Sequence, residues 1–356
     1  MKKKLLMAAV GAALVAGPMV AAHAAGATLY GHLHLSMDRF DSDIAERGFM
    51  ANNSSRFGFK GDEDLGGGLK AIYQAESGIF GVDEGGGFGG TLRNTFVGFA
   101  GSWGAVKLGR HDTPYKDLGR KLDNFNEQVG DMRNIIGNGD AADGATTSGS
   151  FDQRVSNMIR YESPNFAGLN VVVQHTSNNG AEAGATGNTA LKDNSLGVNW
   201  SSGPLFLGAA WNERGTTNVN NNDESGIRLA GSYTMDAFTI GLLWESLSDI
   251  GGVNGADRDA MGLAASMKMG NNKFKFHWLD ADKLDNAADT GGDMFAIGVD
   301  HTFSKTAMVY LNYASVSNDT NASFQTASGV AGHGDNLVVT NGRDANAFSA
   351  GYILKF

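Results

Sequence analysis

The last nine residues of the chain alternate in polarity and end on an aromatic side chain. Every second position is apolar, and these positions are Phe348, Ala350, Tyr352, Leu354 and Phe356. Successive side chains of a strand point to opposite faces, so this run predicts a β-strand with a continuous apolar face. Chain ends in water-soluble domains usually fray. A terminal aromatic therefore favours a strand whose outer face stays in lipid to its last residue, as in a membrane-spanning β-barrel.

The first residues have the pattern of a secretory signal. Lysines at positions 2–4 precede an apolar stretch from Leu5 to about Val20, and the small-residue sequence Ala22-His23-Ala24 follows. This order predicts a signal peptide over residues 1–24 and a barrel domain over residues 25–356. An uncleaved membrane anchor fits the cleavage-like end less well. Loss of the three lysines would change the formal net charge of −10 to −13.

No later segment approaches the roughly 18 apolar residues that a membrane helix needs. A chain in lipid must then satisfy its backbone as a closed barrel. The composition agrees, because glycine reaches 51 residues while proline is limited to 4. The chain has no cysteine, which excludes disulfides, zinc–thiolate sites and thiol nucleophiles. An acidic total without basic clusters argues against nucleic acid as a partner.

Alternating segments recur along the whole chain. They predict an all-β fold, a 16-stranded antiparallel transmembrane β-barrel with strands of roughly 9–13 residues. Short turns alternate with longer polar links, which are expected near 41–51, 81–90, 111–150, 178–190, 214–224, 249–257, 283–291 and 318–343. Short turns should therefore lie on one side of the membrane and long loops on the other. A soluble β-sandwich would show the same alternation but would lack the secretory signal.

Several sequence motifs resemble those of a known family. They occupy ranges 28–31 (TLYG), 55–61 (SRFGFKG), 63–71 (EDLGGGLKA), 93–98 (RNTFVG) and 104–110 (GAVKLGR). In these motifs the chain resembles the general porins of Gram-negative outer membranes, in their proteobacterial branch. The resemblance implies a homotrimer in outer-membrane lipid and lipopolysaccharide. It also implies a third extracellular loop folded into the barrel, and a terminal aromatic, here Phe356, that the barrel-assembly machinery reads.

The link at about 111–150 is the longest and is expected to have a function. It is the candidate for the inward-folded constriction loop. It carries Asp112, and its candidate constriction residues are Asp117, Asp123, Glu127 and Asp131. Related porins carry a Pro-Glu-Phe-Gly-Gly-Asp stretch at the tip of this loop. The corresponding residues here, 127–131, match that stretch only in part.

By resemblance, basic residues on the barrel wall face this loop. The motifs assign this place to Arg56, Lys60, Arg93 and Arg154. Their parity is opposite to that of the apolar side chains Phe57 and Phe59, in the fourth strand to that of Phe96, and in the strand after the long link to that of Val155. These four side chains are therefore expected to point into water, since a cation on the lipid side would cost roughly 2–4 kcal/mol at mid-bilayer.

Carboxylates on one wall and arginines on the other predict a transverse field across a narrow passage. The predicted function is passive diffusion of small hydrophilic solutes and ions, with no cofactor and no catalytic residue. The same charges could instead be ion pairs that anchor the loop. Acidic loops favour cations and the basic wall favours anions, so the sequence leaves selectivity open, with a slight bias to cations.

Two other functions compete with the channel. His175 and Ser177 resemble the His-x-Ser signature of outer-membrane phospholipases, in which histidine activates serine. A barrel that acts mainly as a surface receptor or adhesin would depend on its outer loops. No metal site is expected, because the spacing of Asp285, Asp289 and Asp293 fits no calcium loop. His32 and His34 share the inward parity of the first strand and are expected as wall residues.

Overall fold

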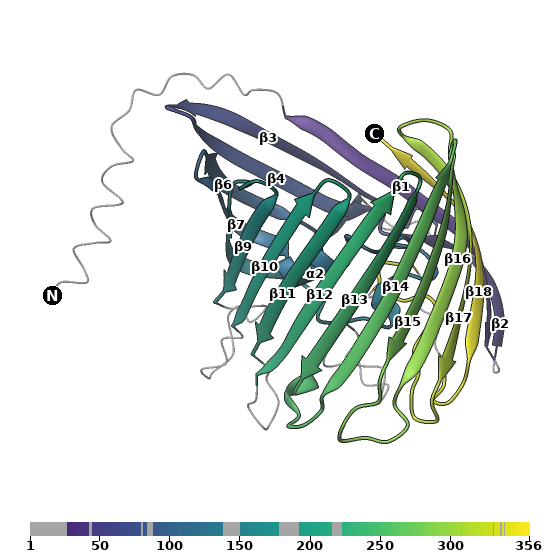
Figure 1. Ribbon diagram of the computed structural model, residues 1–356. Coiled ribbons are helices and arrows are strands. Elements are labelled where there is room, and N and C mark those ends of the chain that lie inside the picture. Colours follow the sequence, from purple (N-terminus) through teal and green to yellow (C-terminus); the bar gives the residue numbers. More distant parts are fainter. Residues whose placement is uncertain are drawn as a thin grey trace.

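The protein forms one closed barrel of antiparallel strands (Figure 1). The computed structural model describes residues 27–42, 45–79, 81–83, 88–137, 150–177, 192–215, 223–329, 331–334, 337 and 339–356. The expected signal peptide lies outside these residues. No helix in the described ranges is both long enough and apolar enough to span a bilayer.

Two barrel strands are interrupted, so the eighteen strand segments of the described chain make up a sixteen-stranded barrel. The first interrupted strand comprises β2 (Ala45–Asn52) and β3 (Arg56–Gly66), which both pair with β1 (Thr28–Ser42). The second comprises β5 (Phe88–Leu92) and β6 (Thr95–Gly101), which both pair with β4 (Leu69–Ile79). The predicted all-β, 16-stranded antiparallel barrel is confirmed.

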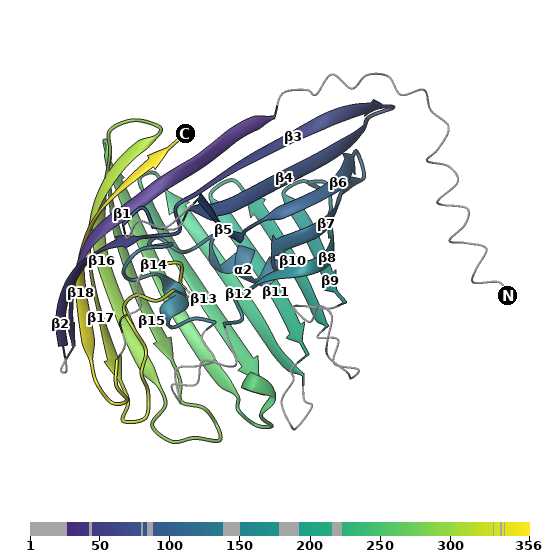
Figure 2. The same ribbon diagram turned by 180° about the vertical axis from the view of Figure 1, so that it is seen from behind.

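The other strands follow one another around the wall, each paired with its sequence neighbour (Figures 1 and 2). They are β7 (Gly104–Asp112), β8 (Arg154–Glu162), β9 (Leu169–Thr176), β10 (Asp193–Ser202), β11 (Leu205–Arg214), β12 (Glu224–Met235), β13 (Phe238–Ser248), β14 (Arg258–Met269), β15 (Asn272–Ala281), β16 (Gly292–Thr302), β17 (Ala307–Asn318) and β18 (Ala345–Lys355). A short 3-10 helix, η2 (Ile250–Gly252), follows β13.

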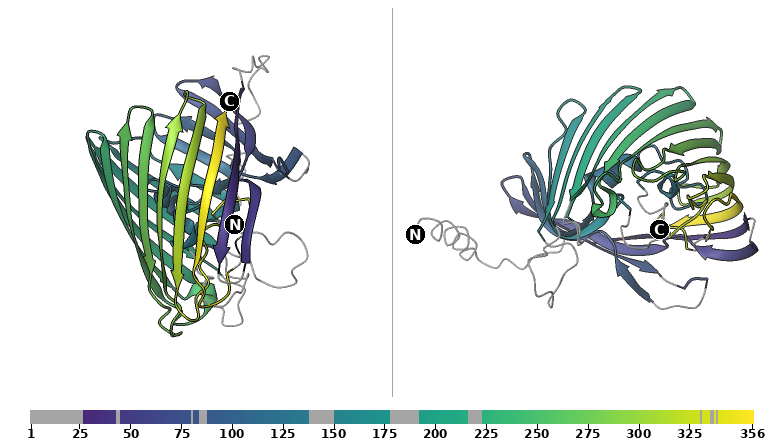
Figure 3. Two further views of the ribbon diagram at one scale, coloured as in Figure 1. Left: turned by 90° about the vertical axis from the view of Figure 1, so that its right-hand side faces the viewer. Right: turned by 90° about the horizontal axis from the view of Figure 1, so that it is seen from below.

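Connection lengths differ between the two ends of the barrel. The tight turns lie at the top of Figure 1, at the same end as the C-terminus, and the longer connections lie at the bottom. Figure 3 shows the same wall from a third side and from below.

The expectation of a long link at 41–51 is wrong. β1 runs to Ser42, β2 begins at Ala45, and these two residues are paired, because the alternating pattern continues through the acidic stretch.

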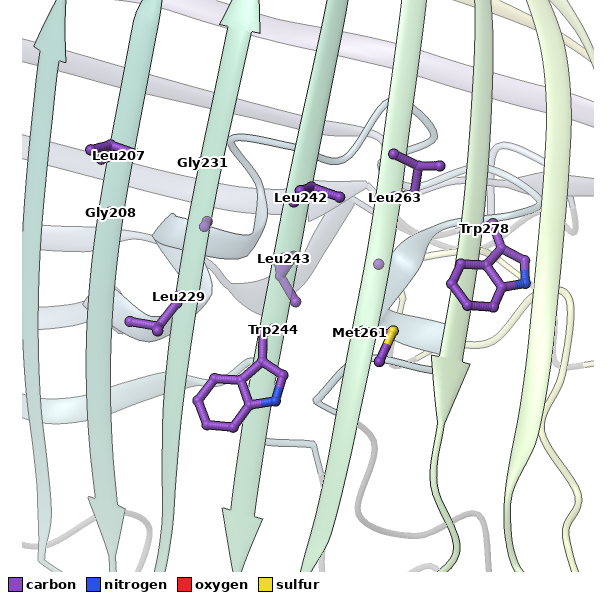
Figure 4. A pocket seen from close by; sticks show the side chains of 12 residues that line it. Leu207, Gly208, Leu229, Gly231, Leu242, Leu243, Trp244, Met261, Leu263 and Trp278 are labelled. Carbon is purple, nitrogen blue, oxygen red and sulfur yellow. The ribbon is translucent and has the colours of Figure 1, made fainter.

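Each strand separates two kinds of surface. In β13, Leu242 and Trp244 are exposed on the outer face, whereas Leu243 and Glu245 point inward and are buried. Figure 4 shows part of the outer face, where a shallow apolar groove of about 580 Å³ lies over β11–β15. Its lining is almost wholly aliphatic or aromatic, which suits contact with hydrocarbon rather than water.

The last strand closes the barrel against the first. β18 pairs with β1 from His32 opposite Lys355 to Ser42 opposite Ala345. Beyond this ladder, Gly31 and Phe356 exchange two backbone hydrogen bonds of 3.0 Å. The Phe356 ring lies directly over Gly31, where a Cβ atom would come within 2.6 Å of it. The alternation predicted from the C-terminal run is confirmed, since Phe348 and Phe356 are exposed whereas Ser349 is buried.

Candidate functional site

Residues 113–137, which follow β7, are called here the inner segment, because they contact inward-pointing side chains of the wall. The segment begins with a one-turn helix, α2 (Pro114–Gly119), beside β10, β11 and β12. Thr113 caps this helix, its hydroxyl accepting from the backbone N–H of Lys116 at 3.3 Å. A 3-10 turn, η1 (Met132–Asn134), follows and is capped in the same way by Asp131.

Four inward-facing glycines on neighbouring strands give the inner segment room to approach the wall. A Cβ atom at any of the four would lie 3.0 Å or less from a side chain of the segment. The four pairs are Gly197 with Pro114, Gly208 with Leu118, Gly226 with Tyr115, and Gly241 with Leu122. We call these four glycines the glycine seat. Larger side chains there would push the segment away from the wall.

Apolar burial and hydrogen bonds together hold the inner segment in place. Leu118, Phe125 and Ile135 are buried in one cluster with wall residues such as Leu243 and Leu279. At one end of the segment, the Tyr115 hydroxyl donates to the Glu245 carboxylate at 2.6 Å. Further along, the Lys275 ammonium donates to the Gln128 side-chain oxygen at 2.6 Å.

Glu127 extends from the inner segment toward a different part of the wall. Arg56 Nη1 donates to both carboxylate oxygens of Glu127, at 2.8 and 2.9 Å. Arg93 Nη2 and Arg120 Nη2 each lie 3.4 Å from Oε1 of the same carboxylate. Arg93 also bonds Glu76, with Nε 2.8 Å from Oε1. Glu127 is thus surrounded by three guanidinium groups.

A second carboxylate, Asp112 at the end of β7, extends the same set of charges. Arg154 Nη2 and Lys116 Nζ each lie 3.1 Å from its Oδ1, and Arg120 Nη1 lies 3.1 Å from Oδ2. Arg120 therefore connects the two carboxylates. We call the connected set the arginine network; it consists of Arg56, Glu76, Arg93, Asp112, Lys116, Arg120, Glu127 and Arg154.

The network fixes the charge of its members in the inner segment. Burial alone would raise the pKa of Glu127, but Arg56, Arg93 and Arg120 outweigh it and hold that pKa well below its usual range. Burial lowers the pKa of Lys116 to about 8, even though Asp112 favours the charged form. Glu127 is ionised, and Lys116 is protonated at neutral pH but close to titration.

A polar recess of about 450 Å³ adjoins the network beside α2. Its charged lining comes from Asp117, Arg120, Lys121, Arg160 and Glu162. Arg160 bonds both acids, with Nη2 2.8 Å from Asp117 Oδ2 and Nε 2.7 Å from Glu162 Oε1. The recess is open and charged, as expected for a water-filled space.

Comparison with known proteins identifies the family. A family model described as Gram-negative porin matches residues 8–321 of the chain. The chain belongs to the Gram-negative porins.

Relatives of this porin come from the outer membranes of proteobacteria. The chain is 30% identical to outer membrane porin protein 32 of Delftia acidovorans, over 89% of this chain and 90% of the relative. It is 28% identical to the major outer membrane protein P.IB of a Neisseria meningitidis serogroup B strain, over 93% of this chain and 98% of the relative.

Solved structures show the same fold. An anion-selective porin from Comamonas acidovorans superposes with a TM-score of 0.78 at 24% identity, covering 93% of this chain and 99% of that one. OmpT of Vibrio cholerae superposes with a TM-score of 0.66 at 18% identity, covering 94% and 100%. Family and fold together make this porin a diffusion channel of the outer membrane.

Four of the eight site residues predicted from the sequence belong to the arginine network. Arg56 and Arg93 both reach Glu127, as the resemblance implies. Arg154 instead bonds Asp112, which lies in β7 before the inner segment.

The other four predicted residues lie elsewhere. Lys60 is exposed, with its ammonium 5.2 Å from the centre of the Tyr30 ring. Asp117 faces the recess, and Asp131 bonds Arg133, whose Nε lies 3.0 Å from Oδ1. Asp123 is buried, and that burial, reinforced by Asp131, raises the pKa of its carboxyl well above the usual range.

Four network members are not among the predicted site residues, and one of them, Asp112, lies at the start of the predicted long link. Arg120 and Lys116 belong to the inner segment, and Glu76 lies in β4. One signal was available for the first two: Lys116 and Arg120 follow Asp112 at intervals of four residues, a spacing that suits ion pairs on a helix. Nothing in the sequence marks Glu76 as a member. Its contact with Arg93 arises because β4 pairs with the interrupted strand that carries Arg93.

The parity argument assumes that Phe96 and Val155 face lipid, and this assumption is wrong for both. Val155 is buried in one cluster with Phe96. Val97 and Phe99 are the exposed side chains of β6, so Phe96 points inward, where the Lys107 ammonium lies 4.9 Å from its ring centre. Arg93 nevertheless faces inward, because the strand is interrupted at Arg93 and Asn94 and the alternation restarts after them.

The arrangement of His175 does not favour the phospholipase alternative. Its Nδ1 lies 2.7 Å from the Asn194 side-chain oxygen. Among the described residues, no hydrogen bond joins His175 to Ser177. A serine nucleophile needs such a contact with its base.

Proposed function

We propose that the inner segment is the constriction loop of this porin, and that the arginine network lines the narrowest part of the passage. The observation that carries the proposal is the position of Glu127. Its carboxylate belongs to a segment seated against β10–β13, yet it is bound by Arg56 and Arg93 of the N-terminal strands. A segment that contacts both parts of the wall divides the cross-section of the barrel.

The network then acts on solutes through its field. Fixed charges of both signs orient water in a passage with low-dielectric walls. A small polar solute replaces that water with its own dipole and hydrogen bonds, whereas an apolar solute displaces it without compensation. Passage follows the concentration gradient and needs no cofactor, and we propose that the protein has no enzymatic activity.

The charge count of the network favours anions. Five cationic groups face three carboxylates, a surplus of two positive charges at neutral pH. The slight cation bias suggested by the acidic loops and by the net charge of −13 expected without the signal peptide gives way to this local surplus, because passing ions meet the network at close range. A structural relative is described as an anion-selective porin, which supports the same assignment.

We further propose that the porin forms a homotrimer in outer-membrane lipid and lipopolysaccharide, and that the barrel-assembly machinery reads Phe356. A structure of OmpT from Vibrio cholerae is described as a trimer form, which supports the first part. Cross-linking of the protein in native membranes tests it, with a trimer as the expected largest product.

Purified porin in a planar bilayer tests the channel proposal directly. In a gradient of potassium chloride, the zero-current potential should have the sign of chloride preference. The triple variant Arg56→Gln, Arg93→Gln, Arg154→Gln should shift it toward potassium and change the single-channel conductance. Unchanged values in the triple variant would contradict the assignment of these side chains to the passage.

A further inference from the structure

Three side chains that can bind a metal meet beside the arginine network, although the sequence predicts no metal site. They are His32, His34 and Glu127, and one ligand atom from each lies within 4.8 Å of the other two. Glu127 and His34 are buried, and the His32 side chain is 12% exposed. The group therefore lies at the surface of the passage rather than in bulk water.

Two structural features bring these side chains together. His32 and His34 are two positions apart on β1, so both imidazoles project from the same inward face, with ring centres 6.2 Å apart. Glu127 has a left-handed backbone with φ of 63°, which is rare for a residue with a side chain. This turn directs its carboxylate toward β1, where Oε2 lies 3.8 Å from His32 Nε2.

The two oxygens of Glu127 have different surroundings. Arg93 and Arg120 both approach Oε1, at 3.4 Å each. Within the described part of the chain, Oε2 is bonded by Arg56 alone, and it is the oxygen that faces His32. One carboxylate oxygen can therefore turn to a metal ion while the other keeps its guanidinium partners.

The histidine rings have partners of the kind that orient metal ligands. His34 Nε2 lies 2.9 Å from the Tyr310 hydroxyl, and His32 Nε2 lies 3.2 Å from the Ser54 carbonyl oxygen. Both contacts are made by Nε2, whereas such a partner orients a metal-binding ring through the nitrogen that does not bind the metal. Each ring can therefore use Nδ1 for the ion, or exchange its contact at Nε2 for a ligand bond. A small movement of each ring would bring its nitrogen to bonding distance of a shared ion.

We propose that His32, His34 and Glu127 form a transition-metal site at the constriction, and that Zn²⁺ or Cu²⁺ bound there blocks the channel. Two imidazoles and one carboxylate, with water completing the shell, suit these ions. The neighbouring guanidiniums repel any cation, so an ion must gain enough from imidazole bonds to offset that repulsion. Mg²⁺ and Ca²⁺ prefer oxygen ligands and do not meet this condition.

Binding is tested first without reference to conduction. Titration of the detergent-solubilised barrel with Zn²⁺ in a calorimeter should give one saturable site per chain, and Cu²⁺ should show nitrogen coupling in its paramagnetic resonance spectrum. His32→Gln and His34→Gln should each weaken binding by about tenfold or more. His175→Gln, an exposed histidine elsewhere in the barrel, is the matched control and should bind as the unchanged protein does.

Conduction is tested next in planar bilayers, and this arm alone depends on the proposed constriction. Micromolar Zn²⁺ should reduce single-channel conductance in the unchanged protein and in His175→Gln, and Mg²⁺ at the same concentration should not. Each variant is compared with its own metal-free conductance. Absent Zn²⁺ binding, or binding equally strong in His32→Gln and His34→Gln, would overturn the metal site. Site-specific binding without block would keep the site but contradict its position at the constriction.

Discussion

Glu127 is the residue on which the charge balance of the passage most depends. Glu127→Gln removes one of three carboxylates and raises the surplus of positive charge from two to three. A unit charge about 4 Å away contributes about 1 kcal/mol in water, a change of up to roughly fivefold for each ion and of opposite sign for chloride and potassium. The permeability ratio of chloride to potassium should therefore rise by up to roughly thirtyfold. Zero-current potentials in a salt gradient measure this ratio.

The control for this variant is Asp62→Asn. Asp62 forms an exposed pair with Lys70, 2.8 Å apart, so its loss changes the total charge equally but away from the network. The ratio should stay close to that of the unchanged protein. Equal shifts in both variants would mean that total charge rather than the network sets selectivity.

Lys116 predicts a dependence on pH. Its burial lowers its pKa to about 8, so the group is charged below that pH and neutral above it. As pH rises through 8, the network falls from five cations to four, and chloride preference should decrease. Reversal potentials between pH 6.5 and 9.5 would show the change.

Lys116→Arg keeps the charge and does not titrate in this range, so it should abolish the pH effect. A pH effect of the same size in this variant would assign it to another group.

A family motif fixes the place of a side chain more closely than its position in a long link does. Arg56 lies in a motif of the family and was predicted to face the loop, which it does through Glu127. Asp123 and Asp131 were predicted for the same role only because they lie in the long link. Their actual positions follow from turn geometry and burial, which no spacing in the sequence reveals.

At the level of elements, the glycine seat determines how the inner segment lies. Gly208→Val would place two methyl groups against Leu118, which already fills the space over Gly208. Such overpacking costs about 1–3 kcal/mol and should loosen α2 from the wall. Single-channel recordings should then show a changed conductance and more frequent closures.

Gly231→Val is the matched control for the seat. Gly231 lies in β12 but points outward, where its nearest neighbour is the flexible end of Leu207 at 3.2 Å. Its conductance and closure frequency should match those of the unchanged protein. A steady conductance in Gly208→Val would show that the segment is held by its hydrogen bonds rather than by close packing.

Alternation predicted the strands well because one face of each strand is apolar and the other polar over most of its length. It failed where the strand is interrupted, as at Arg93 and Asn94, or contains an extra residue, as at Asn157 in β8 with its φ of 53°. Interruptions of this kind depend on pairing between distant segments, and the sequence of one strand alone does not contain that information.

On the scale of the whole molecule, the barrel is stable only when its first and last strands meet. An open sheet would leave unpaired backbone groups in lipid, at a cost of several kcal/mol each. The pairing of these strands ends at Gly31 and Phe356, where the aromatic ring lies over the glycine. The C-terminus lies at the barrel end with the tight turns (Figure 1), and the Phe356 side chain is exposed on the outer face of the wall.

Deletion of Phe356 should therefore impair assembly far more than it changes the conductance of the barrels that form. The deletion removes both backbone bonds to Gly31 and the ring, whereas Phe356→Ala keeps the bonds and should have an intermediate effect. The folded fraction in outer membranes, measured by heat-modifiable migration in gels, reports assembly. Phe303→Ala, which removes another exposed aromatic from a tight turn, should assemble normally. Normal assembly of the deletion variant with altered conductance would reverse the assignment and place the terminal residue in the passage.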